Sequence, residues 1–134
     1  MSKTLSRITY VEDEPDIRAV AELALTRIGG FELDVCTSGT QAIERAPKYK
    51  PDLILLDVMM PGLDGVDTLR VLRGIRELAG TPVIFMTAKV QNHEVERYKE
   101  LGAIDVIPKP FDPMTLADEV TEKWNRHQEE GLPS

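Results

Sequence analysis

The sequence predicts one doubly wound α/β domain: a five-stranded parallel sheet with helices on both faces. Three observations predict it. Short apolar runs alternate with helical patterns, the run at residues 53–56 is apolar at every position, and the chain has 134 residues. Alternating strands and helices form right-handed crossovers that pack back onto a parallel sheet. A strand with no polar position is typical of the middle of such a sheet, where both faces are covered.

Each strand is predicted from a short apolar run bounded by turn residues. Pro51-Asp52 opens the third run, Thr81-Pro82 opens the fourth, and Gly102 precedes the fifth. These residue types favour the loops that connect helices to strands. The five predicted strands cover residues 8–11, 32–37, 53–56, 83–87 and 104–107.

The helices are predicted from apolar residues that recur at three- and four-residue steps. Pro15 suits the first turn of the first helix, and Gly29-Gly30 ends it. The fourth helix has a thin apolar stripe, Val95 and Tyr98, whereas the last buries a stripe that includes Trp124. The predicted helices lie at about 15–28, around 42–46, from about 64 to Gly80, at about 92–101 and around 116–124.

We expect a single domain over residues 1–134, with a core at about 6–126 and a polar tail at 128–134 that frays. No linker, repeat or low-complexity stretch divides the sequence. The pattern suits the flavodoxin-like strand order 2-1-3-4-5. In that order the direction of winding reverses beside the first strand and opens a crevice at the carboxyl ends of the strands.

Composition excludes several classes of protein. The 16 basic and 23 acidic residues give a net charge of −7, and no Lys/Arg cluster is visible, so direct binding of DNA or RNA is not expected. The single cysteine, Cys36, excludes an internal disulfide and indicates a reducing compartment. No signal peptide and no run of about 18 apolar residues is visible. We therefore expect a soluble cytoplasmic protein without membrane contact.

Acidic residues stand at the ends of two predicted strands. Asp57 closes the third strand, and Glu12-Asp13 follows the first. Taken singly, each has an ordinary explanation, because Asp also caps helices and forms turns. Three carboxylates at one crevice, however, repel each other and raise one another's pKa unless a cation neutralises them. Oxygen ligands favour Mg²⁺, and a Mg²⁺ site indicates phosphate chemistry.

Two further strand ends carry groups that suit a phosphoryl group. Thr87 ends the fourth strand and offers a hydroxyl, and Lys109 follows the fifth and offers a compact positive charge. Alone, Thr87 is also explained as a cap and Lys109 as a solvated loop lysine. Beside three carboxylates they predict a phosphoryl pocket, and Lys109-Pro110 is a candidate cis peptide bond.

Four motifs, one at each of these strand ends, resemble those of a known family. The chain is similar to the receiver domains of two-component response regulators, including the stand-alone chemotaxis type, over about residues 6–126. The motifs occur in the family's order, and the four together are highly specific. They are Val11–Pro15, Leu55–Gly65, Met86–Ala88 and Pro108–Phe111.

The resemblance implies that Asp57 accepts a phosphoryl group from a phosphohistidine on a histidine kinase or a histidine phosphotransfer protein. It also implies Mg²⁺ as the cofactor, with Asp13 and Asp57 as ligands. Glu12 would bind the metal directly or through water, and the backbone carbonyl of Met59 would be a further ligand. The protein is then a signalling switch rather than an enzyme, and it catalyses its own phosphorylation and slow dephosphorylation.

The resemblance further implies that Thr87 and the amide of Ala88 hold phosphoryl oxygens, while Lys109 pairs with the developing charge. Three features of this chain matter against the family pattern. Lys89 and Met59 flank the path of an attacking water and should tune dephosphorylation. Glu12 replaces the commoner Asp, and Val106 stands where a Tyr or Phe often acts as an aromatic switch.

The downstream partner is expected to be a protein target or a second copy of the chain. We expect it to bind through the surface of the fourth helix, the fifth strand and the fifth helix. The charged fourth helix motivates this expectation, although an ordinary solvated helix would have the same composition.

Three alternative functions remain open. A Mg²⁺-dependent small phosphatase would use Asp57 as a turnover nucleophile, but Met59 stands where such enzymes often have a second carboxylate. A flavodoxin-like cofactor binder needs a loop rich in Gly, Ser and Thr after the first strand, and residues 12–16 are mainly acidic instead. A receiver-like adaptor would bind partners without phosphorylation, and Val106 lends it slight support.

Overall fold

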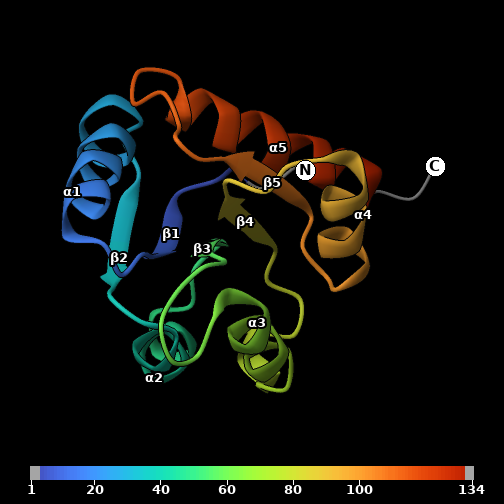
Figure 1. Ribbon diagram of the computed structural model, residues 1–134. Coiled ribbons are helices and arrows are strands. Elements are labelled where there is room, and N and C mark those ends of the chain that lie inside the picture. Colours follow the sequence, from blue (N-terminus) through green and yellow to red (C-terminus); the bar gives the residue numbers. More distant parts are fainter. Residues whose placement is uncertain (1–3, 132–134) are drawn as a thin grey trace.

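The sheet of the computed structural model has five parallel strands in the order β2-β1-β3-β4-β5, which confirms the predicted topology (Figure 1). The structure describes residues 4–131. The order reverses beside β1, because β2 and β3 lie on either side of it. The strands are β1 (Arg7–Val11), β2 (Glu32–Cys36), β3 (Leu53–Asp57), β4 (Val83–Thr87) and β5 (Asp105–Pro108).

The central strand β3 is buried along its whole length. Leu53 and Leu55 pack into one core cluster, and Ile54 and Leu56 pack into another. Successive side chains of a strand point to opposite faces, so a continuous apolar run supplies both cores. The polar end of the strand, Asp57, therefore lies at the edge of both cores.

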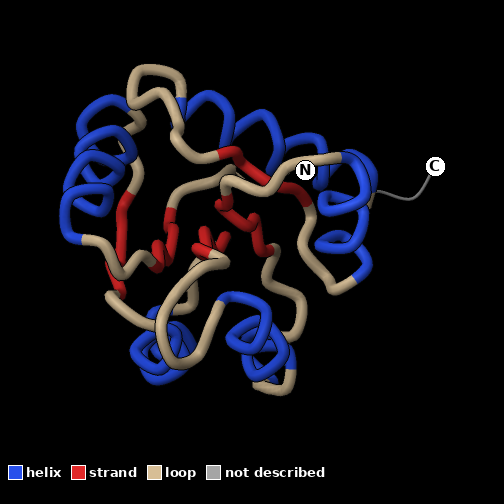
Figure 2. Tube along the Cα trace, in the orientation of Figure 1, coloured by secondary structure: helices blue, strands red, loops and turns tan. Residues whose placement is uncertain are grey.

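Helices enclose the sheet on both faces (Figures 1 and 2). One core cluster includes Ala21 of α1 and Trp124 of α5, and the other includes Ala46 of α2, Leu69 of α3 and Tyr98 of α4. The helices are α1 (Pro15–Leu23), α2 (Gly39–Tyr49), α3 (Gly65–Arg73), α4 (Asn92–Glu100) and α5 (Leu116–Glu130).

Two predicted helices change type before the predicted end. The first is α-helical only to Leu23 and continues as a π-helical turn, Ala24–Ile28. The third is α-helical only to Arg73, and a 3-10 turn, Arg76–Leu78, follows it. The apolar spacing does not distinguish these turns from α-helix, because all of them return a side chain to the same face within three to five residues.

The last strand and helix also differ from the prediction at their ends. β5 covers Asp105–Pro108, one residue later than predicted. α5 continues to Glu130, so residues 128–130 are helical rather than frayed, and residues 132–134 lie outside the described part. The ion pair between Arg126 and Glu122, one helical turn apart, supports this polar end. Within the described residues, no helix has the length and apolar character needed to cross a membrane.

An aromatic contact joins helix α4 to the sheet. Tyr98 is buried, and its ring packs edge-to-face on Phe85 of β4, with the ring centroids 5.3 Å apart. Phe85 lies opposite Val106 in the sheet register, and Val106 is also buried. The aromatic side chains near this end of the sheet thus come from β4 and α4 rather than from β5.

A glycine allows the connection after β3 to pack closely against the strand end. The amide of Gly65 donates to the carbonyl oxygen of Val58 at 2.9 Å. A Cβ at position 65 would lie 2.4 Å from the carbonyl oxygen of Asp57 and 2.7 Å from the Cα of Val58. Both are backbone atoms, so they could not move aside without displacing the backbone of Asp57.

We expect Gly65→Ala to lower the free energy of unfolding by about 1–3 kcal/mol, the usual cost of overpacking. Gly80→Ala is the matched control, because a Cβ there would meet no atom within 4 Å. The control should change stability by no more than about 0.5 kcal/mol. Urea unfolding followed by circular dichroism measures both variants, and equal effects would show that the contact at Gly65 is not tight.

Candidate functional site

Four strand ends meet at one edge of the sheet and build the candidate site. Glu12 follows β1, Asp57 ends β3, Thr87 ends β4, and Lys109 follows β5. The strands are parallel, so their carboxyl ends lie at the same edge, and the order reverses beside β1. Such a switch point is where open α/β sheets bind ligands. The tertiary structure thus brings together residues that lie up to 97 positions apart in sequence.

Three carboxylates gather at this edge as the sequence predicts. Glu12, Asp13 and Asp57 each offer an oxygen, and these oxygens lie within 4.8 Å of one another. Glu12 is fully buried and Asp57 is 2% exposed, while Asp13 is partly buried. Water therefore screens their mutual repulsion only weakly.

Lys109 bridges two of these carboxylates. Its Nζ donates to Glu12 Oε1 at 2.9 Å and to Asp57 Oδ1 at 3.2 Å. The lysine side chain is 17% exposed, so both ion pairs are largely removed from solvent. The Lys109-Pro110 peptide bond is cis, as the sequence predicts.

The pKa values of the bridged groups reflect one cation shared by two anions. Burial, followed by the negative charge of Glu12, raises the pKa of Asp57 from 3.8 to about 7, although Lys109 opposes this shift. Burial lowers the pKa of Lys109, but the hydrogen bond to Glu12 and the charge of Asp57 outweigh burial and raise it. The lysine therefore stays protonated, and the site has too little positive charge for its carboxylates.

The donor set fits a hard divalent cation. Asp13 Oδ1 is buried and has no hydrogen-bond partner among the described residues. A buried carboxylate oxygen without a partner is costly unless a cation or ordered water completes its shell. Three clustered carboxylates with only oxygen donors favour Mg²⁺ over softer metals.

The remaining predicted site residues line the edge of this cluster. Thr87 is buried, and its Oγ1 accepts a hydrogen bond from the amide of Lys89 at 3.1 Å. Ala88 is exposed beside it. Met59, two residues after Asp57, has an outward side chain that is 64% exposed, and the role of its carbonyl stays a prediction.

Sequence reasoning missed an arginine that contacts the acidic pair. Nη1 of Arg18 in α1 donates to the carbonyl oxygens of Glu12, at 3.0 Å, and Asp13, at 3.3 Å. The only sequence signal is a basic residue one turn into the helix that follows the acids. That signal is weak, because most helices carry an arginine or a lysine.

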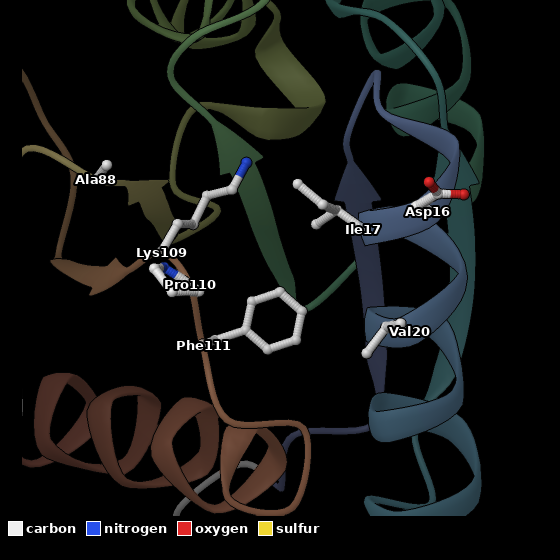
Figure 3. Close-up of a pocket in the computed structure, with 7 residues that line it drawn as sticks. All are labelled: Asp16, Ile17, Val20, Ala88, Lys109, Pro110 and Phe111. Carbon is white, nitrogen blue, oxygen red and sulfur yellow. The ribbon is translucent and has the colours of Figure 1, made fainter.

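A mainly apolar groove opens beside the site and was also missed. In Figure 3, Ile17 and Val20 of α1 face Phe111 across it, and the Lys109 side chain reaches along its upper edge. The groove has a volume of about 520 Å³. Val20 is 43% exposed, so it lines this groove rather than the core. The groove lining is Asp16, Ile17, Val20, Ala88, Lys109, Pro110 and Phe111.

Comparisons with known proteins point to one family. The DNA-binding response regulator MtrA of Mycolicibacterium smegmatis is 36% identical over 130 residues, which are 97% of this chain and 55% of that protein. The transcriptional regulatory protein CseB of Streptomyces coelicolor is 39% identical over 111 residues, 83% of this chain and 46% of that protein. Among solved structures, the chemotaxis response regulator CheY4 of Vibrio cholerae has a TM-score of 0.82 at 27% identity. That match covers 90% of this chain and 99% of CheY4.

These relatives correct one expectation. The sequence led us to expect only protein partners and no direct nucleic acid, yet MtrA is named a DNA-binding response regulator. The expectation rested on the net charge of −7 and the missing basic cluster. The chain spans about half the length of the curated relatives it matches, so its own charge does not describe the rest of such proteins.

The match to the family includes the whole candidate site. The family model described as the response regulator receiver domain matches residues 8–121, which contain all four strand ends of the site. Two-component response regulators are signalling proteins. The chain therefore belongs to the response regulator receiver domain family.

Proposed function

We propose that this receiver domain takes a phosphoryl group onto Asp57 from a phosphohistidine of a partner kinase or phosphotransfer protein. The observation that carries the proposal is the arrangement around Asp57. Its buried carboxylate lies between the acidic pair and the ammonium of Lys109 at the open edge of the sheet. A carboxylate held there is an activated nucleophile with a positive charge already in place.

The proposed reaction forms one bond and breaks one. A carboxylate oxygen of Asp57 attacks the phosphorus atom, the bond from phosphorus to the donor's imidazole nitrogen breaks, and the electron pair stays on that nitrogen. An acyl phosphate forms on Asp57. Phosphoryl transfer depends chiefly on positioning and charge stabilisation, which the fixed groups of this site would supply.

Glu12, Asp13 and Asp57 would hold Mg²⁺, with the Met59 carbonyl as a further ligand. When bound, Mg²⁺ would neutralise charge on the carboxylates and on the phosphoryl oxygens. The protein's own contribution is to hold these carboxylates together in a buried site, and burial, followed by the charge of Glu12, raises the pKa of Asp57.

Thr87, Ala88 and Lys109 would hold the phosphoryl oxygens. The Thr87 hydroxyl accepts from the Lys89 amide, so its own hydrogen is free to donate to a phosphoryl oxygen. Lys109 already lies 3.2 Å from Asp57 Oδ1 and would follow the charge onto the transferred group.

The apolar groove favours a protein as the phosphoryl donor over a small phosphate ester. Its lining joins Ala88 and Lys109 of the site to Ile17 and Val20 of α1. A protein that covered these apolar side chains would gain from their burial while placing a histidine over Asp57. A small ester would leave the groove open to water. For this reason we rank the small-phosphatase alternative below phosphoryl transfer from a partner protein.

We propose that the phosphorylated receiver then changes what it binds, and that DNA-directed regulation is among its outputs. The names of two relatives support this proposal, since MtrA is named a DNA-binding response regulator and CseB a transcriptional regulatory protein. The protein would catalyse its own phosphorylation and its slow dephosphorylation. Its cytoplasmic location, which the sequence led us to expect, stays a prediction.

Acetyl phosphate with Mg²⁺ tests the proposal. We expect the intact mass to rise by one phosphoryl group, and we expect EDTA or Asp57→Asn to abolish the gain. Asp118→Asn, at an exposed position in α5, is the matched control and should be phosphorylated like the wild type. A wild-type chain that gains no mass with acetyl phosphate or with phosphohistidine donors would favour the adaptor alternative instead.

The charge at Asp57 predicts an unusual dependence of stability on pH. Between about pH 4 and pH 7 the folded protein keeps a proton on Asp57 that the unfolded chain has lost, because the folded pKa is about 7. Stability without metal should therefore fall as the pH rises through this range. Asp57→Asn removes this effect, and its free energy of unfolding should exceed that of the wild type by on the order of 2 kcal/mol at pH 8.

Urea unfolding of both proteins from pH 4 to pH 8 in EDTA measures this difference. The advantage of Asp57→Asn should shrink towards pH 4 and also shrink on addition of Mg²⁺, which neutralises the same carboxylate. Asp118→Asn should follow the wild type at every pH. An advantage of Asp57→Asn that is constant across the range would contradict the assigned pKa.

A further inference from the structure

Arg18 is the one basic residue in a strongly acidic segment. Residues 12–18 hold four acidic residues and this arginine. It lies in the second turn of α1, where its own amide donates to the carbonyl oxygen of Glu14 at 2.9 Å. From there the guanidinium reaches back to the chain that joins β1 to α1.

The guanidinium binds backbone rather than carboxylate. Its Nη1 donates to the carbonyl oxygens of Glu12 and Asp13 at 3.0 and 3.3 Å. The other anchors of this segment act at Glu12, whose Oε1 accepts from Nζ of Lys109 at 2.9 Å and whose Oε2 accepts from the amide of Glu14 at 3.3 Å. The amide of Glu12 donates to the carbonyl of Cys36 at 3.1 Å, and Glu14, which caps α1, makes no side-chain capping bond. One side chain thus ties both carbonyls of the acidic pair to the helix.

This tie opposes a specific repulsion. The carboxylates of Glu12 and Asp13 are forced towards Asp57, and the mutual repulsion of these groups would push the β1–α1 connection away from β3. A bond from α1 to both carbonyl oxygens resists that movement without using the carboxylates. Asp13 Oδ1, which has no partner among the described residues, remains available to a cation.

We propose that Arg18 is a positioning residue for the metal site, which fixes the backbone of Glu12 and Asp13 so that their carboxylates can bind one divalent cation together. This proposal rests on the proposed function. It assigns Arg18 no contact with the phosphoryl group, and its effect passes through the acidic pair alone.

Two explanations of Arg18 predict opposite signs. If Arg18 were only a positive charge near the site, removing it would make cation binding tighter, because a competing cation would be lost. If Arg18 fixes the ligand backbone, removing it makes cation binding weaker. Substitutions that support metal ligands from behind typically change affinity by 10- to 100-fold.

The experiment is calorimetric titration of the metal-free chain with Mg²⁺, repeated with Mn²⁺, in the absence of any phosphoryl donor. We expect Arg18→Ala to weaken binding by about 10-fold. Arg18→Lys keeps the charge, but its shorter side chain brings the ammonium short of the position of Nη1, which donates both bonds, so it should lie between Arg18→Ala and the wild type. Arg70→Ala is the matched control, because it removes the same charge from an exposed position on α3. This variant should bind Mg²⁺ as tightly as the wild type.

Each outcome decides the assignment. If Arg18→Ala binds Mg²⁺ as tightly as the wild type, or more tightly, the positioning role of Arg18 is overturned. If Arg18→Ala fails to fold in urea controls, Arg18→Lys decides, and wild-type affinity in that variant also overturns the backbone role. A wild-type chain that binds neither ion would instead refute the metal site of the proposed function, so the two failures are distinguishable.

Discussion

The forced proximity of buried carboxylates is the constraint on which the rest of this structure depends. Glu12 and Asp57 lie almost out of contact with water, and one lysine pairs with both. Such a cluster destabilises the fold unless the surrounding structure holds it. The sheet does so through β1 and β3, which pair along their length and are buried on both faces. The apolar strands therefore provide the stability that the polar edge lacks.

The backbone next to the site is shaped to keep the carboxylates together. Gly65 lets the chain after β3 pack against the carbonyl of Asp57, where a larger residue would collide. Arg18 holds the carbonyls after β1 from the opposite side. Lys109 reaches in from the end of β5. Three different devices thus act on one small region. Gly65 and Arg18 act on backbone atoms alone, whereas Lys109 pairs with one oxygen of Glu12 and one of Asp57.

Much of the fold and the principal site residues could be predicted from the sequence, for a physical reason. Strands buried on both faces must be continuously apolar, so their ends are marked by the first polar residue, and in a parallel sheet those ends converge. Asp57 and Thr87 were found in this way. Arg18 and the groove at Val20 depend on contacts between separate segments, which periodicity does not record. The π-helical turn at Ala24–Ile28 was missed because it keeps side chains on the same face as an α-helix does. The net charge likewise describes only this chain, so the expectation of no direct nucleic-acid binding that rested on it does not hold for the longer relative MtrA.

The charge of the site also constrains how the proposed switch would work. Three carboxylates and the ammonium of Lys109 leave two negative charges, which one divalent cation balances. A phosphoryl group on Asp57 carries about two negative charges in place of one. In the proposed switch, the added charge would draw Lys109 away from Glu12 and towards the phosphoryl oxygens, because the stronger anion would compete for the same ammonium. The bond between Lys109 and Glu12 at 2.9 Å would therefore be the contact that phosphorylation weakens first, and it links the residues that follow β1 and β5. The change would begin between strands, so an aromatic residue at Val106 is not needed for its first step.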